Sequence, residues 1–278
     1  MVGGDGARSY AKNSCHQRVV VDATKEMVKD AIADNLELKT MEIDASRTFK
    51  MVDLGSSTGP NTFIAVQNII EAVEQKYLAQ HQNPSALEFQ VFFNDHYDND
   101  FNTLFKSLPP SRNYFATGVP GSFHSRLFPN STLHFVYGDC NIYCKIYDLL
   151  GSCLIDLVKM ELISEEKVDS FNFPLYYPTP KEFETIIEIN GLFTIERTNI
   201  LAYAAMEKTF SAVDSTSKIR AVFEGLIKEH FGNEVVNQIF NHFTTKLLTG
   251  NILTIDDLEN HNKIDLFISL KRIDHQLI

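Results

Sequence analysis

Residues 49–61, FKMVDLGSSTGPN, decide the fold of this chain. The run 49–54 is mostly apolar and predicts a buried strand, and the turn after it contains two glycines, Gly55 and Gly59. Beyond the turn, apolar residues recur at spacings of three and four, which predicts an amphipathic helix packed on a sheet. They are Phe63, Val66, Ile70, Val73 and Tyr77. A strand, a glycine turn and a helix in this order are typical of a parallel α/β sheet.

The segments on either side of this unit extend the same pattern. A helix is predicted over residues 17–35, where Val20, Ala23, Met27 and Ala31 share one face. A second strand is predicted over residues 88–93, and it ends in Asn94 and Asp95. The order helix, strand, glycine turn, helix, strand predicts a doubly wound sheet. We therefore assign residues 1–145 to a Rossmann-like, cofactor-binding part.

The remainder of the chain is richer in helix signals. Thr179 and Glu182 form a capping box around Pro180, and Asn190-Gly191 is a helix end. Further helices and strands are predicted at 132–137 (strand), 146–161 (helix), 192–196 (strand), 218–231 (helix) and 265–271 (strand). We expect residues 146–264 to form a helical cap with one returning strand near 192–197, and residues 265–278 to supply the closing strand of the sheet.

Composition excludes several classes of protein. The chain has 278 residues, 44% of them hydrophobic and 22% charged, which is ordinary for a globular protein. Its net charge of −11 argues against nucleic-acid and anionic-membrane partners. The absence of a long apolar run and of an apolar leader predicts a cytoplasmic protein. The four cysteines match no zinc or CxxC spacing, so we expect reduced thiols.

The glycine turn and the ends of the two strands suggest a ligand. Glycine lets the backbone approach a ligand, and the N-terminus of the following helix favours a carboxylate. Asp53 is placed to bind an ammonium group, and Asp95, at the next strand tip, to bind ribose hydroxyls. Adenosine with an amino-acid tail fits this set. A tight turn without a ligand explains the glycines equally well, and the missing third glycine disfavours an NAD-linked oxidoreductase.

An acidic stretch follows Asp95. It contains Asp98, Asn99 and Asp100 and invites interpretation as a calcium site, but it has neither the central glycine nor the final glutamate of an EF-hand loop. A helix N-cap at Asn99 or Asp100 explains the stretch better.

Several motifs, in order along the chain, carry a resemblance to a known family. They occupy residues 3–17, 53–61, 92–102, 119–123, 163–172, 177–180 and 229–232. In these motifs the chain resembles the plant SABATH methyltransferases, which depend on S-adenosylmethionine (SAM) and methylate carboxylic acids or, in some members, ring nitrogens. The resemblance implies a Rossmann-like class I methyltransferase fold, α/β with an α-helical cap, a small carboxylic acid or xanthine-like substrate, and a homodimer.

The resemblance also implies roles for residues around the methionine end of the cofactor. Tyr10 and Ser14 would line the cofactor. Asp53 and Asn61 would hold its methionine end, with Gly55 in the loop beside it.

Other residues would bind the nucleoside. By the same resemblance, Asp95 would bind the ribose and His96 would lie beside the adenine. Ser122 and Phe123 would close over the adenine and the sulfonium side.

For the substrate, the resemblance assigns Gln17 to orient the carboxylate, with Tyr10 and Lys12 beside it. A carboxylic acid with a pKa near ~4 is ionised at neutral pH, so no general base is required. Family members have also been assigned a magnesium site, for which we assign no ligands here.

The chain departs from the family after the strand at 133–136. Family members continue there with an aromatic substrate clamp and further strands, whereas this chain passes through 137–141 almost directly to 149–152, which resembles the cap. A second, shorter gap follows Arg197. We therefore expect part of the substrate pocket and central strands to be missing, with strand edges exposed. A non-catalytic or truncated paralogue, binding the cofactor or a family partner without turnover, is the alternative to an active methyltransferase.

Overall fold

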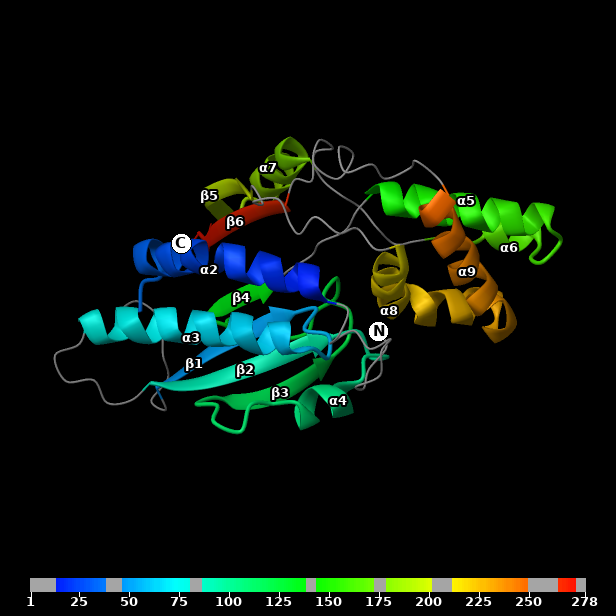
Figure 1. The fold of residues 1–278 in the computed structure, drawn as a ribbon. Helices are drawn as coiled ribbons and strands as arrows, with labels where there is room; N and C mark the ends of the chain where they lie inside the picture. The colour runs from blue at the N-terminus through cyan, green and yellow to red at the C-terminus, as the bar shows by residue number, and fades with distance from the viewer. Residues whose placement is uncertain are drawn as a thin grey trace.

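The computed structural model describes residues 14–38, 47–80, 87–138, 144–172, 179–201, 212–249 and 265–273. Its main sheet has four parallel strands in the order β3-β2-β1-β4 (Figure 1). The strands are β1 (Thr48–Leu54), β2 (Glu88–Asp95), β3 (Phe115–Pro120) and β4 (Phe135–Gly138). The predicted Rossmann-like arrangement is thus confirmed for this half of the chain.

Two long helices cover one face of the main sheet. They are α2 (Cys15–Asn35) and α3 (Pro60–Gln80), which lie side by side in Figure 1. Alternate residues of β1 and β2 point towards them, so Phe49, Met51 and Phe93 are buried in a core shared with Ile32 and Ile70. The core forms because the apolar stripes of the two helices meet the apolar face of the sheet.

Strand β3 was not predicted from the sequence. It contains Gly118 and ends in Pro120, and both residues are unfavourable inside strands. The structure explains the glycine, because a Cβ atom there would lie 3.0 Å from the ring of Phe105 in helix α4 (Phe101–Lys106). The ring packs where a side chain would otherwise stand.

The predicted helix ends are confirmed. Asp100 is the N-cap of α4, and its carboxylate accepts a hydrogen bond from the Thr103 amide at 2.9 Å. Thr179 and Glu182 form the capping box of α7 (Pro180–Asn190), and Gly191 ends that helix with φ 67°.

The last strand does not close the main sheet, which corrects the sequence prediction. Strand β6 (Asp265–Arg272) pairs antiparallel with β5 (Phe193–Leu201) in a separate two-stranded sheet. Helix α7 packs against β5. An ion pair between Arg197 and Asp30, at 3.5 Å, joins the small sheet to α2, and a second one, between Lys271 and Glu37 at 2.5 Å, joins it to the segment after that helix.

Strand β4 is the outermost strand of the main sheet on its side. Among the described residues it pairs only with β1. Its Val136, on the face away from α2 and α3, is 55% exposed. Parallel sheets are normally covered on both faces, so this exposure agrees with the predicted loss of central elements.

Four helices form a second core. They are α5 (Cys144–Lys159), α6 (Glu165–Asp169), α8 (Ala212–Phe231) and α9 (Asn233–Thr249), grouped together in Figure 1. Their contacts bury Leu150, Leu157, Ile239 and Phe243. Cys153 is a free thiol within this core, and burial raises its pKa to about 11. The helical cap expected from the sequence is built from these helices, whereas α7 lies with the small sheet.

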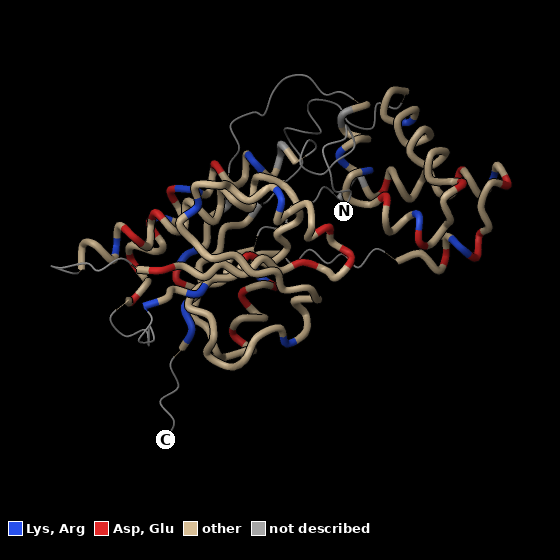
Figure 2. The backbone as a smooth tube through the Cα atoms, turned by 90° about the horizontal axis from the view of Figure 1, so that it is seen from below, with Lys and Arg blue, Asp and Glu red and all other residues tan. Residues whose placement is uncertain are grey.

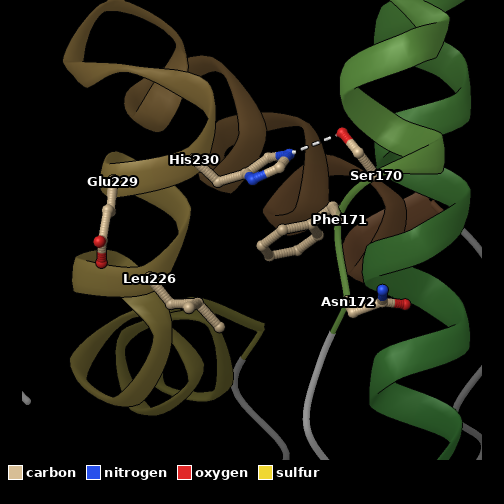
Figure 3. Close-up of a pocket in the computed structure, with 6 residues that line it drawn as sticks. All are labelled: Ser170, Phe171, Asn172, Leu226, Glu229 and His230. Carbon is tan, nitrogen blue, oxygen red and sulfur yellow. Dashed lines mark hydrogen bonds between the residues drawn. The ribbon is translucent and has the colours of Figure 1, made fainter.

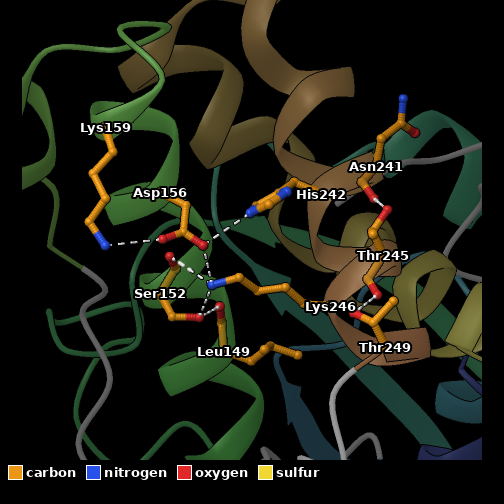
Figure 4. A network of polar contacts seen from close by, with 9 residues as sticks. All are labelled: Leu149, Ser152, Asp156, Lys159, Asn241, His242, Thr245, Lys246 and Thr249. Carbon is orange, nitrogen blue, oxygen red and sulfur yellow. Dashed lines mark hydrogen bonds and ion pairs between the residues drawn. The ribbon is translucent and has the colours of Figure 1, made fainter.

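A polar network joins α5 to α9 at the edge of the helical core (Figure 4). The Asp156 carboxylate is contacted by Lys246 Nζ at 2.5 Å, by His242 Nε2 at 3.2 Å and by Lys159 Nζ at 3.4 Å. Lys246 also donates to the Ser152 carbonyl at 3.1 Å. The hydrogen bond from Lys246, followed by that from His242, holds the pKa of Asp156 well below its usual range.

We expect Asp156→Asn to destabilise the helical cap at pH 7 and the difference to shrink in acid. A lowered pKa in the folded state contributes stability above the unfolded value of ~4, and this contribution is lost as the pH falls further. Urea titrations at pH 7, 5, 4 and 3, followed by far-UV circular dichroism, measure the effect. Asp148→Asn, an exposed acid on the same helix, is the control. Equal stability of Asp156→Asn and the unaltered chain at pH 7 would contradict the expectation.

Charged residues are interspersed over the described chain. In Figure 2 basic and acidic positions are scattered along the described part of the tube, and no basic cluster stands out among them. No helix within the described ranges combines the length and apolarity needed to cross a membrane.

Candidate cofactor site

All four strands of the main sheet end at the same edge, because they are parallel. A cavity lies there, between the ends of β1 and β4 and the helices α2 and α3. Residues that line it are Gln17, Val21, Asp53, Gly55, Ser56, Gly59, Asn61, Thr62, Ala65 and Tyr137. The structure therefore brings together four predicted site residues from α2, β1, the glycine turn and α3. The cavity has a volume of about 40 Å³.

Asp53 is the buried acid of this cavity. It is 4% exposed, and its carboxylate accepts a hydrogen bond from the Thr62 hydroxyl in the first turn of α3. On the other side of the turn, the Asn61 amide donates to the Ser14 carbonyl at 2.8 Å and to its hydroxyl at 3.0 Å. Ser14 is thus held at the site through Asn61, although it does not line the cavity.

The backbone of the glycine turn joins two neighbouring strands. The Gly55 and Ser56 amides both donate to the Asn94 carbonyl at 2.9 Å, so they join the ends of β1 and β2. Gly55 has φ +80°, and nothing lies within 4 Å of the position of a Cβ atom, which leaves the cavity open beside it. The Ser56 hydroxyl is buried at the cavity without a partner among the described residues. It fits a polar ligand group.

Asp95 lies one strand away and holds the turn in place. Its carboxylate accepts hydrogen bonds from the Ser57 amide and from the His96 amide, each at 2.7 Å. The Asn99 side chain donates to the Ser57 carbonyl at 2.9 Å. These contacts fix Ser57 at φ +56°, a conformation that is strained for serine. Each carboxylate oxygen of Asp95 can accept a further hydrogen bond from a ribose hydroxyl.

The remaining predicted residues surround the same edge but are exposed. The Gly121 amide donates to the Asp95 carbonyl at 2.9 Å, which brings Ser122 and Phe123 to this edge. The Phe123 side chain is 54% exposed, and the His96 ring stacks on Tyr97 at 4.0 Å. None of the three predicted residues lines the cavity.

The described residues do not include two of the predicted substrate-site residues, and they contain no recognisable metal site. Tyr10 and Lys12 lie outside the described residues. Within the part of the chain that the structure describes, no group of three or more His, Cys, Asp or Glu side chains could hold a metal ion. No step below depends on a metal.

A larger cavity, of about 330 Å³, lies in the helical cap (Figure 3). It is lined by Ser170, Phe171, Asn172, Leu226, Glu229 and His230, none of which is a predicted site residue. His230 Nε2 lies 2.8 Å from the Lys167 carbonyl and therefore donates to it. The ring of Phe171 packs on that of His230 at 5.0 Å.

The parallel sheet, the glycine turn and an acid at the tip of each central strand define a Rossmann-like, nucleoside-binding class of enzyme, that of the SAM-dependent methyltransferases. The model of the "SAM dependent carboxyl methyltransferase" family matches residues 1–143 and 139–273. The chain belongs to this family and is a SAM-dependent carboxyl O-methyltransferase of the plant SABATH group.

Similarity to individual proteins supports the same family assignment. The chain is 34% identical to loganic acid O-methyltransferase of Catharanthus roseus, over 98% of this chain and 94% of the relative. It is 32% identical to a benzoic acid/salicylic acid carboxyl methyltransferase of Petunia hybrida, over 87% and 90% of the two chains. A solved structure, loganic acid methyltransferase with S-adenosylhomocysteine (SAH), superposes with a TM-score of 0.88 at 33% identity and covers 98% of both chains.

The comparisons also bear on the predicted internal gap. The alignment with the Catharanthus enzyme has 352 positions and the chain has 278 residues, so at least 74 positions, 352 minus 278, have no residue in this chain. The family match divides at residues 139–143, where the sequence predicted the omission. Because the matches reach across nearly the whole of both proteins, they argue against a truncated paralogue.

Proposed function

We propose that the cavity at the ends of β1 and β4 is where this chain methylates the carboxylate of a small acid. The observation that supports this proposal is that Gln17, Asp53 and Asn61 line the same cavity. Gln17 is assigned to the acceptor, and Asp53 and Asn61 are assigned to the methionine end of the cofactor. The homodimer and the cytoplasmic location expected from the sequence belong to this proposal.

Each residue has a defined task in the proposed reaction. When bound, SAM supplies a methyl group on a positively charged sulfur. Asp53 pairs with the cofactor's ammonium group, Asp95 accepts from the ribose hydroxyls, and the Ser56 hydroxyl donates to the cofactor's carboxylate. Gln17 holds one oxygen of the acceptor carboxylate so that the other faces the methyl group. With SAM bound, that oxygen would form the new C–O bond to the methyl group, and the S–C bond would break with its electron pair left on sulfur.

The chain needs no general base for this step, because the acceptor is already ionised at neutral pH. Its contribution is to place the two reactants and to exclude water. A catalytic dyad is therefore not required for the proposed reaction.

The test is calorimetric titration of the purified chain with SAH, followed by methyl-transfer assays. Loganic, benzoic and salicylic acids are the acceptors, and paraxanthine tests the xanthine-like alternative. One-site SAH binding with methyl ester formation supports the proposal. SAH binding without turnover of any acceptor would instead support the non-catalytic alternative, which is favoured by the outermost position of β4 among the strands that the structure describes.

Gln17→Leu is expected to raise the KM of the acid about tenfold and to leave the affinity for SAH unchanged. The reason is that one amide-to-carboxylate hydrogen bond is lost, which is worth ~1.5 kcal/mol. Steady-state kinetics and SAH calorimetry on the same preparation give both numbers. Gln67→Leu is the control, because Gln67 lies on α3 and its side chain donates to the exposed Glu71 at 3.1 Å. An equal loss of SAH affinity would place Gln17 on the cofactor instead.

A further inference from the structure

Tyr137 occupies a position in the fold that the assignments so far do not use. The chain forms β1, continues outward through β2 and β3, and then returns to the other side of β1 with β4. Ligands of open α/β sheets bind at the carboxyl ends of the strands where this change of direction occurs. Here that point lies between the ends of β1 and β4, and Tyr137 is directly opposite Asp53 in their pairing.

Residues paired in neighbouring parallel strands point to the same side of a sheet, about 4.8 Å apart. Asp53 and Tyr137 accordingly line the same cavity, and Gln17 lines it from α2 above. The assigned cofactor contacts lie on β1, at Asp53, and on β2, at Asp95. The β4 side of the cavity, between Tyr137 and Gln17, is the part left for the acceptor.

We infer that Tyr137 is a substrate-binding residue that, together with Gln17, holds the acceptor carboxylate. The inference rests on the proposed function. A tyrosine hydroxyl is protonated at neutral pH and donates a hydrogen bond to a carboxylate oxygen. Gln17 and Tyr137 then supply two donors from opposite sides of the cavity, one from a helix and one from a strand.

The Tyr137 ring has a second consequence. It is half-buried against the core of the main sheet, so its position is fixed by packing. With Val21 it forms an apolar wall next to the polar Gln17. Such a wall suits an acid whose carboxylate is attached to an apolar body, and it keeps water from the reacting oxygen.

Two variants test the inference with the acid of the panel that has the highest kcat/KM. Tyr137→Phe removes the hydroxyl and is expected to raise the KM of the acid about fivefold to tenfold. Tyr137→Leu removes the ring as well and is expected to raise KM by a further several-fold. Both variants are expected to keep the wild-type Kd for SAH within about twofold. Tyr114→Phe is the matched control, because Tyr114 is 6% exposed in the sheet core and does not line the cavity.

The outcomes separate the inference from the function on which it rests. A raised KM with an unchanged SAH affinity supports it. Unchanged KM in both Tyr137 variants overturns it, and so does a parallel loss of SAH affinity, which would assign Tyr137 to the cofactor or to stability. Failure of the unaltered chain to bind SAH or to methylate any acid refutes the proposed function itself, and it is seen before any variant is made.

Discussion

Asp95→Asn is expected to weaken SAH binding by about 100-fold or more. Each hydrogen bond from a ribose hydroxyl to a carboxylate contributes ~1.5–3 kcal/mol, and two are assigned to this side chain. The asparagine also cannot accept both backbone hydrogen bonds that Asp95 now accepts, from Ser57 and from His96. The glycine turn then loses one of the contacts that hold Ser57 in its strained conformation.

Calorimetry with SAH and with 5′-methylthioadenosine measures this effect. Methylthioadenosine carries the ribose but no amino-acid tail, so Asp95→Asn should weaken both ligands. Asp98→Asn is the control, since Asp98 is an exposed acid of the same loop and contacts the exposed His96 ring at 3.4 Å. If Asp95→Asn bound SAH with wild-type affinity, the assignment of Asp95 to the ribose hydroxyls would be wrong.

Asp53→Asn is the second change expected to have a large effect. The asparagine oxygen can still accept from the Thr62 hydroxyl, so the fold is retained, but the charge that pairs with the cofactor's ammonium group is gone. Because Asp53 is 4% exposed, little solvent screens that pair, and we expect a loss of about 100-fold in SAH affinity.

Binding of SAH and of methylthioadenosine also distinguishes the role of Asp53 from that of Asp95. Asp53→Asn should leave methylthioadenosine binding within about twofold, since that ligand has no ammonium group. Thr62→Val keeps the charge of Asp53 and removes its hydrogen bond, so a smaller loss of SAH affinity is expected, of roughly tenfold. If methylthioadenosine and SAH weakened equally in Asp53→Asn, Asp53 would have a structural role instead.

The cofactor half was the most predictable part of the molecule. The strand predicted at 49–54 is β1 (Thr48–Leu54), and the helix predicted at 17–35 is α2 (Cys15–Asn35). These elements are long and strongly periodic, and each buries one face in the same core. The helix ends at Asp100 and Gly191 were predictable for a local reason, because caps depend on the nearest few residues.

Long-range features were not accessible in the same way. The strand at 265–272 was recognised, but its partner depends on which other strands are present. Strand β3 was missed because Gly118 is explained only by the Phe105 ring packed against it.

The site shows the same limit. Asp53 and Asp95 could be chosen because acids at strand tips have a known geometry. Tyr137 was passed over, because nothing near it in the sequence marks it as the residue opposite Asp53. The position becomes informative only once the strand order places β4 beside β1.

The two cores described above bear on how the protein responds to heat. Buried side chains of the sheet half and of the four-helix half form separate clusters with no residue in common. We expect each cluster to unfold as a cooperative unit, so a heating scan should contain two overlapping heat-absorption peaks, and no single melting temperature would describe the protein. A ligand bound at the strand tips should raise the unfolding temperature of the sheet half directly. It should raise the unfolding temperature of the four-helix half only to the extent that contacts couple the two halves.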